Sequence, residues 1–124
     1  MDFRAGRWGD SPAEILQRES SAGFTPSGNL KEGDQVIILF QNMAIMDFRC
    51  DIAYIFAPLS SPALVSGEYR FYDLKNSLKK QLLVTLESKY GQAVELSNDR
   101  WVYETPRSRI VLDLKQSRLI HEKK

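Results

Sequence analysis

A chain of 124 residues has the length of one ordinary domain, and a composition of 43% hydrophobic and 27% charged residues is typical of a globular protein, not a disordered or fibrous one. No apolar run approaches the roughly 20 residues of a membrane-spanning helix. The net charge of +1 comes without a dense basic stripe, which argues against nucleic-acid binding. We therefore expect a single domain over residues 1–124, with no transmembrane segment and no nucleic-acid partner.

The start of the first helix is the strongest local signal in the sequence. Ser11 is a good N-cap residue, Pro12 suits the first helical position, and Glu14 lies where a capping box needs it. The helix is expected to end near residue 20. Residues 21–34 are rich in serine, glycine, asparagine and aspartate, so we expect an irregular connection there.

After this connection the hydrophobic period changes from that of a helix to that of a strand. We expect strands at 36–40, 46–56 and 64–72. The second of these has the clearest pattern, because one of its faces is wholly apolar. Its other face begins charged and ends apolar, which indicates a strand that becomes covered on both sides.

A second helix is predicted by leucines spaced four residues apart between positions 74 and 90, with Gly91 as its stop signal. Further strands are expected at 99–104 and 109–114, and a shorter one at 118–121. The short connections between these segments are typical of hairpins. The sequence shows no internal repeat.

These elements predict an α+β fold, in which two helices pack on one face of a mostly antiparallel sheet of five to six strands, in the order α-β-β-β-α-β-β-(β). Large apolar and aromatic side chains at the inward positions form the expected core: Ile15, Val36, Ile38, Phe48, Ile52, Tyr54, Phe56, Tyr69, Phe71, Leu78, Leu82, Leu86, Trp101, Ile110 and Leu112.

The residue types that carry catalysis are scarce. His121 is the only histidine and is the fourth residue from the end, where we expect a mobile, exposed side chain. Cys50 is the only cysteine, and its place on the apolar face of a strand predicts an inert core thiol. The sequence contains no phosphate-binding glycine loop and gives no indication of a metal site or a cofactor.

One carboxylate spacing is compatible with acid–base chemistry. Asp47 and Asp51 fall on the same face of the strand predicted at 46–56, with Arg49 between them. Two carboxylates held across a cleft serve some hydrolases of sugars. A charged, half-exposed strand face explains the same three residues, and we favour that interpretation.

Several short segments form a pattern that covers most of the chain: Phe3, Trp8-Gly9-Asp10-Ser11-Pro12-Ala13-Glu14 (a W-G-x-S-x-x-E start), Tyr54-Ile55-Phe56, Tyr69-Arg70-Phe71 and Ser88-Lys89-Tyr90-Gly91. Together they resemble a group of small bacterial envelope or secreted domains of largely unassigned function. The helix start is also distantly similar to small outer-membrane assembly lipoproteins and beta-lactamase-inhibitor-like domains. The resemblance implies a periplasmic or secreted interaction domain without a cofactor, if a leader has been removed. A native Met1 would instead indicate a cytoplasmic protein.

The preferred hypothesis is a non-enzymatic binding module of the bacterial cell envelope, with another protein as its partner. Candidate binding residues are Arg49, Glu68 and Arg70 on a sheet face, and Arg107 and Arg109 on a basic hairpin. Two alternatives remain open. One is a small hydrolase that uses the two aspartates described above, and the other is a cytoplasmic adaptor or immunity-type inhibitor. The oligomeric state is also open, because an unpaired sheet edge can recruit a second copy.

Overall fold

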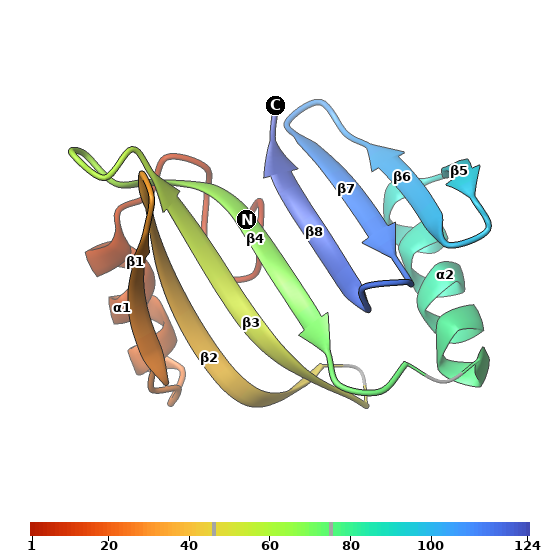
Figure 1. The fold of residues 1–124 in the computed structure, drawn as a ribbon, viewed down its shortest axis with the longest axis horizontal. Coiled ribbons are helices and arrows are strands. Elements are labelled where there is room, and N and C mark those ends of the chain that lie inside the picture. The colour runs from red at the N-terminus through yellow and green to blue at the C-terminus, as the bar shows by residue number, and fades with distance from the viewer. Residues whose placement is uncertain (46, 75) are drawn as a thin grey trace.

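The structure, a computed structural model, describes residues 1–45, 47–74 and 76–124, except for the side chains of residues 76–78. It has an α+β fold, with two helices on one face of an eight-stranded antiparallel sheet (Figure 1). In chain order the elements are α1 (Pro12–Ser21), β1 (Gly28–Glu32), β2 (Gln35–Ile45), β3 (Phe48–Ala57), β4 (Ala63–Phe71), α2 (Asn76–Tyr90), β5 (Val94–Ser97), β6 (Arg100–Glu104), β7 (Ser108–Asp113) and β8 (Arg118–Lys123).

The sheet is built from two equivalent halves. Its strand order is β1-β2-β3-β4-β8-β7-β6-β5, so each half is one helix followed by a four-stranded meander. The last strands of the two halves, β4 and β8, pair at the centre of the sheet, where Gly67 lies opposite His121 and Tyr69 opposite Leu119. The chain therefore has an internal structural repeat, which the sequence analysis did not detect.

The expected number and order of strands were wrong, because the two edge strands, β1 and β5, were missed. β1 lies inside the segment 21–34 that was expected to be irregular, and four strands, not three, precede α2. All four residues of β5 are exposed, and so is most of β1. An edge strand exposed in this way does not need the alternation of apolar and polar residues on which the prediction depended.

The predicted start of α1 is confirmed. The Ser11 hydroxyl accepts a hydrogen bond from the Glu14 amide at 3.3 Å, and the Ser11 amide donates one to the Glu14 carboxylate at 3.3 Å. α2 ends before Gly91, as expected. Gly91 has a φ of 86°, a left-handed conformation that glycine adopts at little cost.

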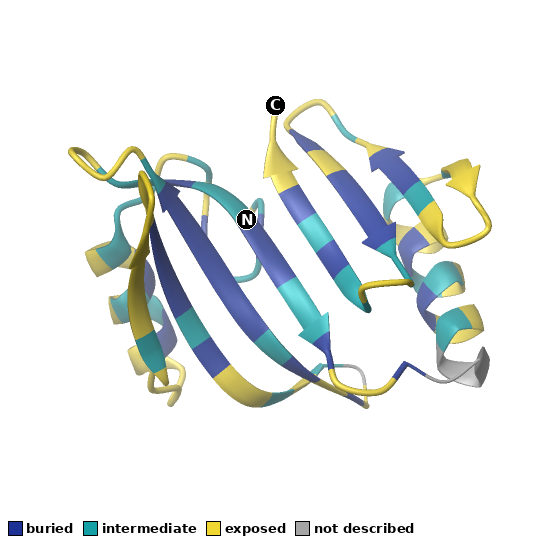
Figure 2. Ribbon diagram, viewed as in Figure 1, coloured by how far each residue is buried: buried dark blue, intermediate teal, exposed yellow. Residues whose placement is uncertain are grey.

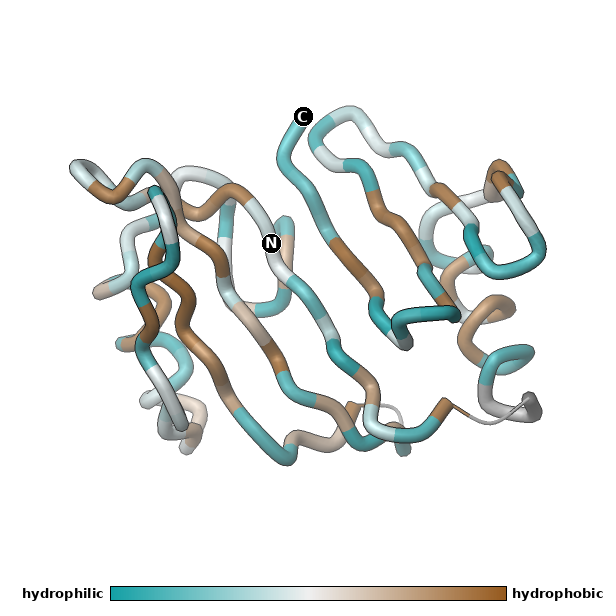
Figure 3. The backbone as a smooth tube through the Cα atoms, viewed as in Figure 1, coloured by the Kyte–Doolittle hydropathy of each residue, from teal (hydrophilic) through white to brown (hydrophobic). Residues whose placement is uncertain are grey.

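The main core lies between the sheet and the helices (Figure 2). Hydrophobic segments run along β2, β3 and β7, the strands that supply much of this core (Figure 3). A small second cluster of Ile37, Ala53 and Ile55 covers the opposite face of β2 and β3, as the sequence of 46–56 predicted. Of the expected core residues, Tyr69 and Trp101 are only half-buried and the Leu78 side chain lies outside the described residues, whereas the others are buried.

The N-terminal segment packs against the centre of the sheet, between the two helices (Figure 1). The ring of Phe3 is fully buried and lies directly on Gly67 of β4, where a Cβ atom would come within 2.2 Å of it. The start of β4 holds this segment in place, since the Leu64 amide donates to the Asp10 carbonyl at 2.8 Å. In the part of the chain that is described, neither helix has the length and apolar content needed to cross a membrane.

Candidate functional site

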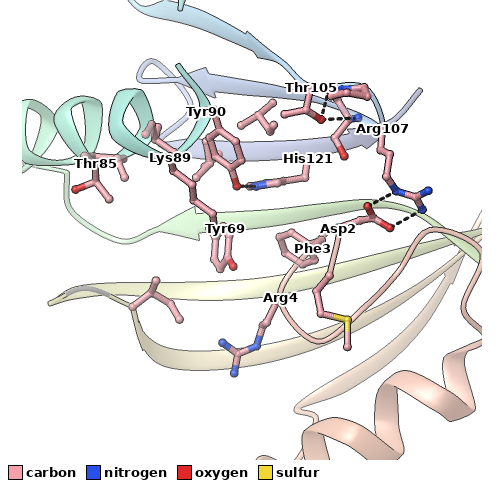
Figure 4. Close-up of a pocket in the computed structure, with 18 of the residues that line it drawn as sticks. Asp2, Phe3, Arg4, Tyr69, Thr85, Lys89, Tyr90, Thr105, Arg107 and His121 are labelled. Carbon is pink, nitrogen blue, oxygen red and sulfur yellow. Dashed lines mark hydrogen bonds and ion pairs between the residues drawn. The ribbon is translucent and has the colours of Figure 1, made fainter. Parts of the chain in front are cut away.

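A pocket of about 520 Å³ opens where the two halves of the sheet meet (Figure 4). Its walls come from the N-terminal segment, β2, β4, α2, the β6–β7 turn, β7 and β8. The apolar lining includes Phe3, Phe71, Leu82, Leu86, Ile110 and Leu119, and the polar lining includes Arg4, Tyr69, Lys89, Tyr90, Arg107 and His121. We call this site the aromatic pocket.

Four rings at the centre of the aromatic pocket pack against one another. The Phe3 ring centroid lies 5.0 Å from that of Tyr69 and 5.2 Å from that of His121. The Tyr90 ring lies 6.1 Å from His121 on the other side. Tilted and edge-to-face arrangements at these separations are favourable for aromatic pairs. The rings therefore form a stable wall of the pocket.

His121 is the most unusual polar group in this wall. It is only 4% exposed, and its Nε2 atom lies 3.2 Å from the Tyr90 hydroxyl, toward which it is directed in Figure 4. Its Nδ1 atom is buried and has no partner among the described residues. Burial, with a contribution from the nearby charge of Lys89, lowers the pKa of His121 to about 4, so the imidazole is neutral at pH 7.

The sequence-based expectation of an exposed, mobile histidine was wrong. His121 lies on β8, and β8 is a central strand, paired with β4 on one side and β7 on the other. The position of a residue near the end of the chain does not indicate mobility when the last strand is inserted into the middle of a sheet.

Tyr69 is the second polar ring of the pocket, and Figure 4 shows it between His121 and Arg4. Burial raises the pKa of Tyr69 to about 12, although the positive charge of Arg4 partly opposes this effect. The phenol is therefore protonated at neutral pH and is available as a hydrogen-bond donor.

Two of the three cationic side chains in the lining have acidic partners. The Arg4 Nε atom donates to Glu19 of α1 at 2.9 Å, and Glu19 is itself buried. Arg107 donates to the two carboxylate oxygens of Asp2 at 2.8 and 3.0 Å, and this contact holds the pKa of Asp2 below its usual value. No ion pair involves Lys89 among the described residues.

The serine and threonine hydroxyls in the lining are occupied by structural hydrogen bonds. The Thr85 hydroxyl donates to the Gln81 carbonyl at 2.9 Å, one turn earlier in α2. The Ser108 hydroxyl accepts a hydrogen bond from the Trp8 indole at 2.9 Å, and Thr105 Oγ1 accepts one from the Ser108 amide at 2.9 Å. None of these three hydroxyls is recorded in contact with a base that would activate it as a nucleophile.

The structure does not bring the five binding residues expected from the sequence together into one site, although Glu68 and Arg70 are in contact as expected for one sheet face. Glu68 is buried on the helix-free face, bonded to Arg70 at 2.8 Å. Arg49 donates to Asn42 at 2.8 Å near the β2–β3 turn, and Arg109 lies 3.9 Å from Glu104. Only Arg107 lines the aromatic pocket.

The two aspartates of the hydrolase alternative have separate structural places. Asp51 accepts hydrogen bonds from the Tyr72 hydroxyl and from the Asn42 amide, at the irregular point of the β2–β3 pairing. Asp47 lies in the β2–β3 turn, where its φ is 68°. Neither residue lines the aromatic pocket.

The central residues of the pocket had no sequence signal that marks a site. Tyr69 and Tyr90 belonged to predicted elements but only as packing residues, and Lys89 was part of a helix end. The pocket forms because β4 and β8, about 50 residues apart, pair at the junction of the two halves. That pairing could not be read from local periodicity.

Among residues 1–45, 47–74 and 76–124, no cluster of three or more histidine, cysteine, aspartate or glutamate side chains is arranged to hold a metal ion. Cys50 is fully buried, so its predicted place in the core is confirmed, and burial raises the pKa of its thiol to about 11. Comparisons with protein families, curated proteins and solved structures identify no match to this chain.

Proposed function

We propose that this protein is a non-enzymatic binding module that takes an organic molecule with a largely apolar body into the aromatic pocket. The observation that carries the proposal is the pocket itself, which has a volume of about 520 Å³ and is lined mainly by aromatic and aliphatic side chains. Sites for small organic ligands have volumes of roughly 300–1,000 Å³ and a mostly apolar lining with a few polar groups. Protein interiors otherwise leave few voids larger than a water molecule.

The unpartnered Nδ1 atom of His121 supports the same proposal. Buried polar atoms without a hydrogen-bond partner are rare in folded proteins, and each one needs an explanation such as a bound molecule. This atom belongs to a ring that lines the pocket. A ligand or a water molecule that enters with it would supply the missing hydrogen bond.

The chemistry of the lining favours binding over catalysis. Two titratable rings of the lining, those of His121 and Tyr69, are held in their neutral forms near pH 7. The hydroxyls of Thr85, Thr105 and Ser108 are engaged in hydrogen bonds that stabilise the fold. A hydrolase would instead need a nucleophile next to a base, or two carboxylates facing a shared cleft.

The test is binding of 2-naphthamide, a neutral ring compound, followed by NMR chemical-shift perturbation of the backbone amides. A Thr85→Trp variant should block the pocket, because Thr85 lines it. Val84→Trp is the matched control on the same helix, since Val84 is 67% exposed and lies outside the lining. We expect shifts around the pocket that Thr85→Trp abolishes and Val84→Trp retains. Shifts elsewhere, or equal binding by a folded Thr85→Trp variant, would contradict the proposal.

The cell-envelope location and the protein partner implied by the resemblance remain predictions. Fractionation of the native host, with the intact mass of the protein, tests the location. A mature chain in the envelope fraction would support an exported domain, and a cytoplasmic protein that begins at Met1 would contradict it. Charge reversal of Arg107 and Arg109 tests whether an acidic partner binds at the β6–β7 hairpin.

A further inference from the structure

We propose that the ligand of the aromatic pocket is an organic anion, with a ring-bearing apolar body among the aromatic side chains and a carboxylate that Lys89 neutralises. This inference rests on the binding function proposed above and adds the chemical class of the ligand. It follows from the balance of charges around the pocket and from the aromatic rings of its lining.

The lining carries three cationic side chains, Arg4, Lys89 and Arg107, and one acidic side chain, Asp2. Arg107 and Asp2 neutralise each other at 2.8 Å. Arg4 is neutralised from behind the lining by Glu19, at 2.9 Å. Among the described side chains of the lining, Lys89 is therefore the cationic group that has no acidic partner. A site with an unpaired cationic side chain is complementary to an anion.

Lys89 is placed where an anion can reach it. It lies in the last turn of α2 and is exposed, and its Nζ atom lies 5.3 Å from the centroid of the Tyr90 ring. Contact with an aromatic face restricts the movement of the ammonium group without neutralising it. An anion whose body occupies the pocket would therefore meet a positioned positive charge at the α2 side of the opening.

The aromatic rings of the lining favour a ligand that contains a planar ring. Phe3, Tyr69, Phe71, Tyr90 and His121 all line the pocket, and aromatic side chains stack or pack edge-to-face with a planar ring more favourably than with a chain. The protonated Tyr69 hydroxyl adds a hydrogen-bond donor in the same lining. Both features fit an aromatic carboxylate better than a saturated alkyl chain or an organic cation.

A structural role for Lys89 has to be separated from ligand binding. A cation in the last turn of a helix is also attracted by the unpaired carbonyl groups at the helix end. That attraction would change the stability of the protein when Lys89 is replaced, but it would not change the preference for a charged ligand over a neutral one. The test therefore compares two ligands on each protein.

The probes are 2-naphthoate and 2-naphthamide, which share a ring system and differ in charge, with decanoate as the chain-like anion. Isothermal titration calorimetry measures their affinities for the wild type, Lys89→Met and Lys80→Met, where Lys80 is an exposed lysine on the same helix outside the lining. We expect naphthoate to bind about fivefold more tightly than naphthamide, with a preference that weakens in high salt. Lys89→Met should remove the preference, and Lys80→Met should retain it.

The possible results separate this inference from the proposed function. If naphthamide binds in the pocket as tightly as naphthoate, or if Lys89→Met keeps the preference, the pocket binds ligands but the anion assignment is wrong. Tighter binding of decanoate than of naphthoate would contradict the proposal that the apolar body of the ligand contains a ring. If neither naphthalene compound binds, both the inference and the proposed function fail.

Discussion

The contact between Phe3 and Gly67 gives the sharpest test of how the N-terminal segment completes the fold. An alanine Cβ at position 67 would lie 2.2, 2.3 and 2.4 Å from three atoms of the Phe3 ring, far inside an ordinary carbon–carbon contact of about 3.5 Å. The ring cannot retreat easily, because the rings of Tyr54, Tyr69 and His121 surround it with centroids 5.0–5.2 Å away. Gly67→Ala must therefore distort the core or expel the Phe3 ring.

Two known effects bound the loss of unfolding free energy expected for Gly67→Ala. Overpacking a core typically costs about 1–3 kcal/mol, and losing a buried phenylalanine ring costs about 3–5 kcal/mol. We expect Gly67→Ala to lower the free energy of unfolding by about 2–4 kcal/mol. In a Phe3→Ala background the clash is gone, so the same change should cost less than about 1 kcal/mol, because alanine is favoured over glycine in a strand.

Urea unfolding followed by tryptophan fluorescence measures these free energies, and a loss of this size moves the midpoint by about 1 M or more. Gly28→Ala is the matched control, since a Cβ on this strand glycine would meet only Leu39, at an ordinary 3.9 Å. The reasoning is refuted if Gly67→Ala costs no more than Gly28→Ala. It is also refuted if the cost is the same with and without the Phe3 ring.

Three further predictions concern single side chains. Burial lowers the pKa of His121 from 6.5 to about 4, so between pH 7 and pH 5 the unfolded chain binds a proton at this residue and the folded chain does not. The free energy of unfolding should therefore fall by about 2 kcal/mol from pH 7 to pH 5. Urea titrations at the two pH values measure this loss, and His121→Leu should abolish it. Leu82→Ala, at a fully buried position, should cost about 2–5 kcal/mol in thermal or urea unfolding, against less than about 0.5 kcal/mol for the exposed Val84→Ala. Ser11→Ala should lower the free energy of unfolding by about 1 kcal/mol, because it removes the capping box. Ser20 is the control, at an exposed position near the other end of α1, and an equal effect of Ser20→Ala would contradict the assignment.

Local signals predicted the parts of the fold that local interactions determine. The capping residues Ser11, Pro12 and Glu14 predicted where α1 begins, because the hydrogen bonds involved connect neighbours in the chain. The alternation at 46–56 predicted the buried face of β3, and its apolar end predicted the small cluster on the other face. Gly91 marked the end of α2, since a left-handed residue is needed there.

Features that depend on distant pairing were not predictable in the same way. β1 and β5 are exposed edge strands, and their pairing with β2 and β6 leaves no apolar alternation in the sequence. Glu19 is buried because Arg4 reaches it from the N-terminal segment, a contact that helical periodicity does not reveal. The structural repeat was hidden because its two halves share an order of elements and not a motif.

The aromatic pocket belongs to the same class of feature. Its wall requires Phe3, Tyr69, Tyr90 and His121 to meet, and these residues come from the two ends and the middle of the chain. The five binding residues expected from the sequence are charged groups, and of these only Arg107 lines the pocket. A pocket at the junction of two repeated halves is visible only once the pairing of β4 with β8 is known.

The most direct test of the central claim is the set of intermolecular nuclear Overhauser effects between 2-naphthoate and the isotope-labelled protein. The account predicts contacts from the naphthalene protons to the side chains of Phe3, Leu86 and Ile110, which line the aromatic pocket. Contacts confined to the helix-free face, for example to Leu30 and Ile37, or the absence of any contact at saturating ligand, would contradict it.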